Sequence, residues 1–124
     1  MKIIEAINRV DALMHNTYSQ NEKVQWLSEL DYDIKQQIID NHEGGQSVSF
    51  TGYNADTPVE TVLLVPAPHD IMYLRWLEAQ IHYHNGEYDH YNNAIVLFNN
   101  AFNDYQKHYT RTHKPLSRGV RFLF

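Results

Sequence analysis

The chain contains no cysteine, which excludes disulfide bonds, thiolate nucleophiles and cysteine-ligated zinc sites. It also lacks any long hydrophobic run, since the longest aliphatic stretch, Val62 to Val65, is far too short to cross a bilayer. The first residues, Met1 to Glu5, reach an acid too early for a secretory signal. We therefore expect an intracellular protein with no membrane partner.

Signatures of catalysis are also missing from the sequence. Gly44-Gly45 lacks the Lys-Ser/Thr pair and the spacing of a phosphate-binding loop, and no nucleophile elbow is present. Acid–base catalysis needs two carboxylates in contrasting environments within one pocket. The pattern instead predicts a solvated helix face for four acidic residues: Glu29, Asp31, Asp33 and Asp40. We expect no enzyme activity, no catalytic residue and no cofactor.

Eight histidines invite a metal interpretation. Glu78 and His82 lie four residues apart, and Glu87 to His90 supplies a single Glu-x-x-His spacing, whereas di-metal bundles use two such pairs and two further glutamates. His82 and His84 point about 200° apart on a helix and cannot share an ion. The sequence therefore predicts no metal ligands, and a bound metal would be needed to revive an enzyme interpretation.

The length of 124 residues, with 43% hydrophobic and 20% charged residues, is typical of one globular domain. The net charge of −5 hides an asymmetry: residues 107–124 carry five bases and no acid, and residues 1–106 carry five bases and fifteen acids. An acidic body is a poor general nucleic-acid binder, so we expect only indirect contact with nucleic acid. The basic end suits docking on an acidic neighbour or a polyanion, and a solvated tail is the alternative.

A stripe of large apolar and aromatic residues predicts a long helix. Its members are three or four residues apart, which places them on one helix face about 35 Å long. We interpret the stripe as core rather than as a ligand-binding surface. Val96 and Leu97 lie off it and suit a second surface, such as another subunit. The stripe consists of Tyr88, Tyr91, Ile95, Phe98, Phe102, Tyr105 and Tyr109.

Three further helices are predicted, over residues 3–14, from 20 to about 41, and from 70 to 85. Ser19 and Glu22 have the spacing of a capping box at the start of the second. The predicted buried face of that helix is Val24, Leu27, Leu30, Ile34 and Ile38. The predicted apolar rows of the third helix are Met72, Trp76, Ala79 and Tyr83, and Leu74, Leu77 and Ile81. The short turn at Asn85-Gly86 makes the third helix and the stripe helix antiparallel neighbours, joined through Trp76 and Phe98.

Residues 43–68 form a connection of about 25 residues, which compact domains rarely keep without a purpose. Residues 47–51 alternate like a strand and 61–65 are a possible partner, so the segment is either a small β-hairpin or a long loop that is fixed against a partner. We expect residues 46–60 to be more mobile than the helices in an isolated subunit. Phe50 and Tyr53 are candidate assembly contacts.

Lys114-Pro115 ends the last helix and separates a helical domain, residues 1–113, from a basic aromatic tail, residues 114–124. The candidate assembly contacts in the tail are Arg118, Val120, Arg121, Phe122 and Phe124. In an extended strand, alternate tail residues share one apolar face with Arg121 opposite. The alternative is that the tail folds back on its own helices. The predicted fold class is mainly α: a small helical bundle built on a long antiparallel α-hairpin.

Several segments read together resemble a known family. They are Glu43-Gly44-Gly45, Val65-Pro66-Ala67-Pro68, residues 73–81, Asn85-Gly86-Glu87-Tyr88, Tyr91-Asn92-Asn93 and Arg111-Thr112-His113-Lys114-Pro115. The chain resembles the small helical head–tail connector, adaptor or head-completion proteins of tailed phages and prophages of Gram-positive bacteria. The resemblance implies a structural subunit of a ring-like homo-oligomer, assembled in the host cytoplasm into the virion, with the portal and tail-completion proteins as partners. It supplies no functional residue. The rival interpretation is a small helical protein- or DNA-binding regulator. Such a regulator is expected to have a basic recognition helix, whereas the basic segment of this sequence is the tail after the last helix.

Overall fold

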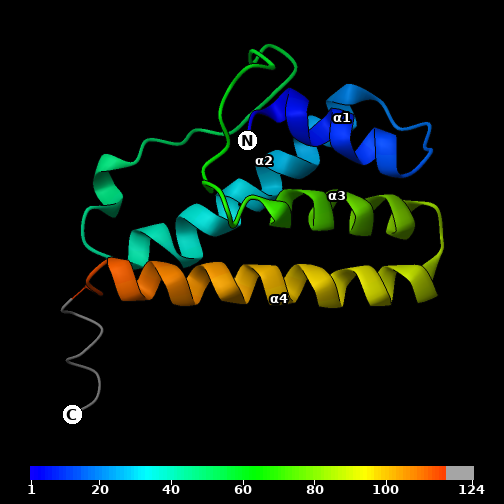
Figure 1. Cartoon of the computed structure of the whole chain (residues 1–124). Coiled ribbons are helices and arrows are strands. Elements are labelled where there is room, and N and C mark those ends of the chain that lie inside the picture. Colours follow the sequence, from blue (N-terminus) through cyan, green and yellow to red (C-terminus); the bar gives the residue numbers. More distant parts are fainter. Residues whose placement is uncertain (117–124) are drawn as a thin grey trace.

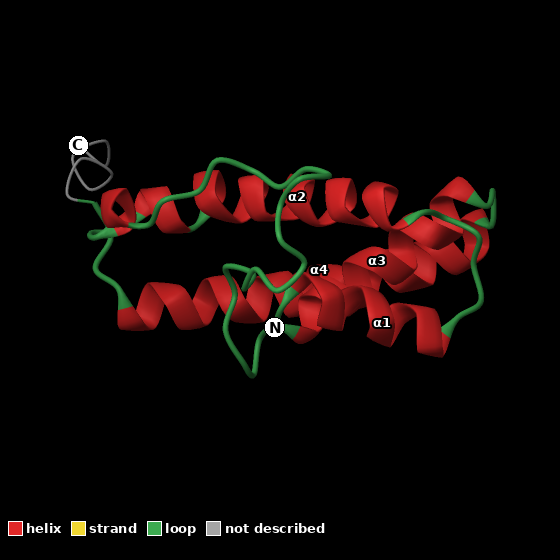
Figure 2. Cartoon of the chain, turned by 90° about the horizontal axis from the view of Figure 1, so that it is seen from above, coloured by secondary structure: helices red, strands yellow, loops and turns green. Residues whose placement is uncertain are grey.

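The protein is a bundle of four α-helices in a computed structural model that describes residues 1–116 (Figure 1). The helices are α1 (Ile3–Leu13), α2 (Gln20–Gln37), α3 (Ile71–His84) and α4 (Tyr88–Thr112), with 3-10 turns at Ile39–Asn41 and Gly45–Ser47. The described chain contains helices and loops and no strand (Figure 2). The mainly α fold class predicted from the sequence is therefore confirmed.

Helices α3 and α4 lie side by side in opposite directions and form the base of the bundle (Figure 1). They are joined through a tight turn in which Gly86 has a φ of 77°, a left-handed conformation that glycine adopts without strain. The rings of Trp76 and Phe98 meet across the pair with centroids 5.0 Å apart, as the sequence predicts. Trp76 Nε1 also donates a 2.7 Å hydrogen bond to the carbonyl of Trp26, which ties α2 to the same seam.

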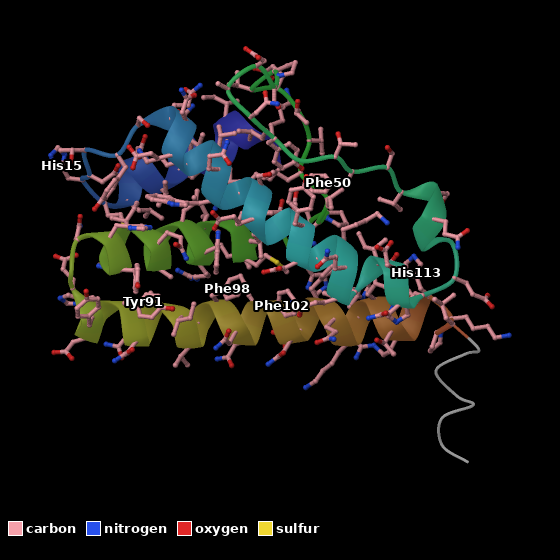
Figure 3. All side chains as sticks on the ribbon, turned by 180° about the vertical axis from the view of Figure 1, so that it is seen from behind. His15, Phe50, Tyr91, Phe98, Phe102 and His113 are labelled. Carbon is pink, nitrogen blue, oxygen red and sulfur yellow. The ribbon has the colours of Figure 1, made fainter. Side chains whose placement is uncertain are left out.

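The stripe on α4 faces the bundle over most of its length, because the helix period keeps its members on one side. Figure 3 shows Tyr91, Phe98 and Phe102 along this helix. The first stripe residue, Tyr88, is 61% exposed, so its predicted burial is wrong. Buried stripe residues are Phe98, Tyr105 and Tyr109, and half-buried ones are Tyr91, Ile95 and Phe102.

The predicted capping box at the start of α2 is present. Ser19 Oγ accepts a hydrogen bond from the Glu22 backbone N–H at 3.1 Å, and the Glu22 carboxylate accepts one from the Ser19 N–H. The helix ends at Gln37, earlier than the predicted end near residue 41, because the chain tightens into the 3-10 turn. Gly45 packs directly on the backbone of Ile39 in that turn, where a β-carbon would clash.

The β-hairpin considered for residues 47–51 and 61–65 does not form, and the described segment consists of loop and a 3-10 turn. Residues 61–63 pair instead with the segment that leads into α1: Ile3 N–H donates to the Thr61 carbonyl at 3.0 Å, and Leu63 N–H donates to the Met1 carbonyl at 2.9 Å. A second short pairing joins the residues after α4 to those after α2, through Glu43 N–H and the Lys114 carbonyl at 2.7 Å. The chain ends of α2 and α4 therefore lie together.

Candidate assembly surface

Three tyrosines gather on the surface where α3 turns into α4. The ring of Tyr83 lies 5.9 Å from that of Tyr88 and 5.3 Å from that of Tyr91, with edge-to-face geometry in both pairs. Tyr83 belongs to a predicted apolar row of α3, and its side chain is 49% exposed. Both Tyr83 and Tyr88 flank the turn at the end of the helical pair, and Tyr88 is 61% exposed there. We call Tyr83, Tyr88 and Tyr91 the tyrosine cluster.

Side-chain contacts hold the α3–α4 turn, which carries the tyrosine cluster, against α2. His84 stacks on the buried ring of Trp26, with centroids 5.1 Å apart and planes 7° apart. Tyr18 lies edge-on to Trp26 at 5.4 Å and donates a 2.6 Å hydrogen bond from its hydroxyl to Asn85 Oδ1 in the turn. These contacts fix the turn against α2 before any partner binds, which lowers the entropic cost of binding there.

Acidic residues border the tyrosine cluster. His82 Nδ1 and Glu87 Oε1 are 3.0 Å apart, and this hydrogen bond holds the pKa of the Glu87 carboxyl below its ordinary value. Asp89 is exposed in the first turn of α4, where the helix dipole favours a negative charge. The surface therefore combines exposed aromatic faces with carboxylates, a chemistry that suits cationic and apolar side chains.

A hollow of about 270 Å³ lies at the other end of α4. The ring of His113 stacks on that of Tyr109 at 3.8 Å, and burial raises the pKa of Tyr105 to about 12. The pocket is thus amphipathic and close to the start of the tail. It is lined by Ile39, Val48, Leu64, Pro66, Tyr105, His108, Tyr109 and His113.

Asp31 is fully buried, so its predicted place on a solvated face is wrong. Its carboxylate accepts hydrogen bonds from the hydroxyls of Tyr53 at 2.6 Å and Tyr73 at 2.7 Å, and from the Leu64 N–H at 3.2 Å. Because these donors come from the loop and from α3, Asp31 clamps both to α2. The sequence contains a signal for this burial, because Asp31 falls in a regular repeat of three and four residues along α2 with Val24, Leu27, Ile34 and Ile38.

The structure places two of the candidate contacts predicted from the sequence. Tyr53 is 7% exposed and bonded to Asp31, which argues against its side chain as an open assembly contact. Phe50 is half-buried, edge-on to Tyr32 at 4.9 Å and to Tyr53 at 5.0 Å, and Figure 3 shows it in the loop beside α2. The five tail candidates lie outside the described residues: Arg118, Val120, Arg121, Phe122 and Phe124.

The greater mobility expected for residues 46–60 stays a prediction. The hydrogen bonds that Asp31 accepts, which we call the Asp31 clamp, can be tested by amide exchange in the same segment. Tyr53→Phe removes one hydrogen bond to a charged acceptor, worth about 1.5–3 kcal/mol. Amide exchange in residues 50–57 should accelerate in this variant, as measured by mass spectrometry. Tyr88→Phe, on an exposed ring, should leave exchange in this segment unchanged, and equal exchange in both variants would contradict the clamp.

The histidines do not assemble a metal site within the described chain, where no group of three or more His, Asp and Glu side chains is placed to hold an ion. Glu78 pairs with Arg75 at 3.2 Å rather than with His82. No helix of residues 1–116 has the length and apolar character needed to span a membrane. Comparisons with family models, curated proteins and solved structures gave no match to this chain.

Proposed function

We propose that this protein is a non-enzymatic assembly subunit, a head–tail connector that joins portal and tail in a tailed phage or prophage. The exposed tyrosine cluster is the observation that carries the assembly role, and the sequence motifs that resemble connector proteins supply the phage context. In this proposal its partners are further copies of itself and the portal and tail-completion proteins, and its location is the virion.

The tyrosine cluster has the properties of a protein-binding surface. Tyrosine is enriched among residues that dominate binding energy at interfaces, because a large rigid ring gains contact area at little entropic cost. Tyr83 and Tyr88 leave about half or more of their surface open to water. Grouped exposed aromatics favour association, and a surface that keeps them on a rigid base supports a binding role.

The two ends of α4 offer different surfaces, which suits a subunit with different neighbours on each side. The tyrosine cluster and its acids mark one end of α4. The amphipathic pocket lies at the other end, and the exposed bases Lys107 and Arg111 lie there too, outside the pocket lining. Contacts between unlike surfaces of identical subunits close into rings when the rotation between copies allows it. The arrangement therefore supports the ring-like homo-oligomer expected of a connector.

Deletion of the gene from its prophage tests the proposal. After induction we expect DNA-filled heads and free tails, with few joined particles, when lysates are counted by electron microscopy. Wild-type protein supplied from a plasmid should restore joining, whereas Tyr83→Ser/Tyr88→Ser protein should not. Leu13→Ser, at another exposed apolar side chain, is the control and should restore joining. A normal yield of tailed particles from the deletion strain would refute the connector role.

A further inference from the structure

We propose that the tyrosine cluster of one copy binds the basic chain end, residues 107–124, of a second copy. The inference rests on the proposed function to the extent that an assembly subunit must contact its own kind, and it names the surfaces that meet. The contact is head-to-tail: each copy offers an acidic aromatic surface at one end of α4 and a basic segment at the other.

Charge complementarity supports this pairing. Glu87 and Asp89 stand beside the cluster, and Lys107, Arg111 and Lys114 are exposed at the opposite end of α4. Within residues 1–116 none of these three bases forms an ion pair. The sequence that follows adds Arg118 and Arg121 and no acid. The two ends therefore attract each other between copies.

The side-chain chemistry also matches. A guanidinium stacks on a tyrosine face and pairs with a carboxylate through its planar fork of N–H donors, so Arg finds both partners at the cluster. Tyr83 lies between the other two rings and offers the central face. The sequence of the tail interleaves its arginines with Val120, Phe122 and Phe124, which suit the aromatic surface. The cluster is thus fitted to a segment that alternates basic and apolar residues.

The arginines that follow Leu116 are too far from the tyrosine cluster of their own copy to bind it. Figure 3 shows Tyr91 and His113 at opposite ends of α4. At 1.5 Å per residue, Tyr88 and Thr112 are about 36 Å apart. Arg118 and Arg121 lie two and five residues after Leu116, and five residues span at most about 18 Å when fully extended. Since these arginines fall short of their own cluster, the partner is a second copy, and repetition of the contact builds a ring or a filament.

Sedimentation velocity on the purified full-length protein tests the contact, at pH 8 and low salt so that free imidazole is neutral and charges are weakly screened. We expect concentration-dependent association of the wild type. The cluster variant Glu87→Lys/Asp89→Lys and the tail variant Arg111→Glu/Arg118→Glu should each raise the Kd of association at least tenfold. The control Asp33→Lys/Asp56→Lys makes the same charge change at exposed acids elsewhere and should associate like the wild type.

A mixture of variants gives the sharper result. In the mixture both contacts between unlike copies are compatible: the reversed cluster meets the reversed tail, and the unchanged basic tail of the cluster variant meets the unchanged acidic cluster of the tail variant. We therefore expect the mixture to regain association, with the two variants alternating, although each variant alone associates weakly. A second cluster variant, Tyr83→Ser/Tyr88→Ser, keeps every charge and should also weaken association, while circular dichroism confirms its helix content. Wild-type protein that stays monomeric, or variants that associate like the wild type, would overturn the proposal.

Failure of this contact and failure of the connector role give different results in the sedimentation and gene-deletion experiments. If the deletion strain loses joined particles but the purified wild type does not associate, the connector role stands and this contact falls. If the contact behaves as proposed but the deletion strain makes tailed particles, the connector role falls and the contact stands.

Discussion

Replacing Phe98 with alanine should lower the free energy of unfolding by about 3–5 kcal/mol, a large fraction of the 5–15 kcal/mol that stabilises a typical domain. Phe98 is 7% exposed and its ring lies 5.0 Å from Trp76 and 5.8 Å from Phe102. Truncation removes the apolar area that joins α4 to α3 and leaves a cavity between two helices that cannot easily collapse. Urea unfolding followed by circular dichroism should show a lower midpoint with a similar slope.

Val96→Ala provides the matched control for this prediction. Val96 lies on the same helix but is 56% exposed, so its truncation should change stability by no more than about 0.5 kcal/mol. If Phe98→Ala and Val96→Ala unfold at the same urea concentration, the seam between α3 and α4 is not what holds the bundle together.

Asp31→Ala should lower the free energy of unfolding by about 3 kcal/mol or more. It leaves two buried hydroxyls and one partly buried N–H without an acceptor, and each unpaired buried group costs about 1–3 kcal/mol. The donors are the hydroxyls of Tyr53 and Tyr73 and the N–H of Leu64. Asp33→Asn, at an exposed acid on the same helix, is the control and should be nearly neutral. The measurement is again the free energy of unfolding in urea.

The clamp also predicts a partial rescue. In Asp31→Leu/Tyr53→Phe the Tyr53 hydroxyl is removed together with its acceptor, whereas in Asp31→Leu alone that hydroxyl is left buried and unpaired. Tyr73 is kept, because its hydroxyl also accepts a 2.8 Å hydrogen bond from the Val65 N–H. The double variant should therefore be more stable than Asp31→Leu alone. A double variant that is less stable than the single one would show that the Tyr53 hydroxyl is not bound chiefly to Asp31.

The stability contributed by Asp31 should depend on pH. Burial raises the pKa of its carboxyl above the ordinary value, although the hydrogen bonds from Tyr53 and Tyr73 act in the opposite direction. Between the unfolded pKa of about 3.9 and the higher folded pKa, the folded state binds more protons. The contribution is therefore fully present below the unfolded pKa and declines as the pH rises through the folded pKa. The stability advantage of wild type over Asp31→Ala should widen as unfolding is measured at pH 7, 5 and 4.

Local patterns in the sequence predicted the helices well. The capping box at Ser19 and Glu22, the turn at Gly86 and the Trp76–Phe98 contact are all present, because each depends on spacing within one or two adjacent elements. Burial of Asp31 was not predicted, since a carboxylate is rarely buried unless paired, and its partners lie 22 and 42 residues further along the chain. No local pattern reveals such a partnership.

The candidate surface was missed for a related reason. Helical spacing assigns Tyr83 to an apolar row of α3 and Tyr88 to the stripe of α4, but only the tertiary structure shows that both side chains stay exposed at the end of the α3–α4 pair. The loop is a third case: alternation in residues 47–51 suggested a hairpin with residues 61–65, yet residues 61–63 pair with the start of the chain, next to α1 and about sixty residues earlier. Pairing partners of short segments are decided by the whole fold rather than by local alternation.

The proposed assembly role is tested most directly by quantitative mass spectrometry of purified, infectious virions of the phage to which the proposal assigns the gene. The account predicts that this protein is present in the virions, at a constant ratio to the portal protein across preparations, and that it stays with the particles after washing in high salt and treatment with nuclease. A protein that is abundant in the lysate but absent from virions would contradict the account.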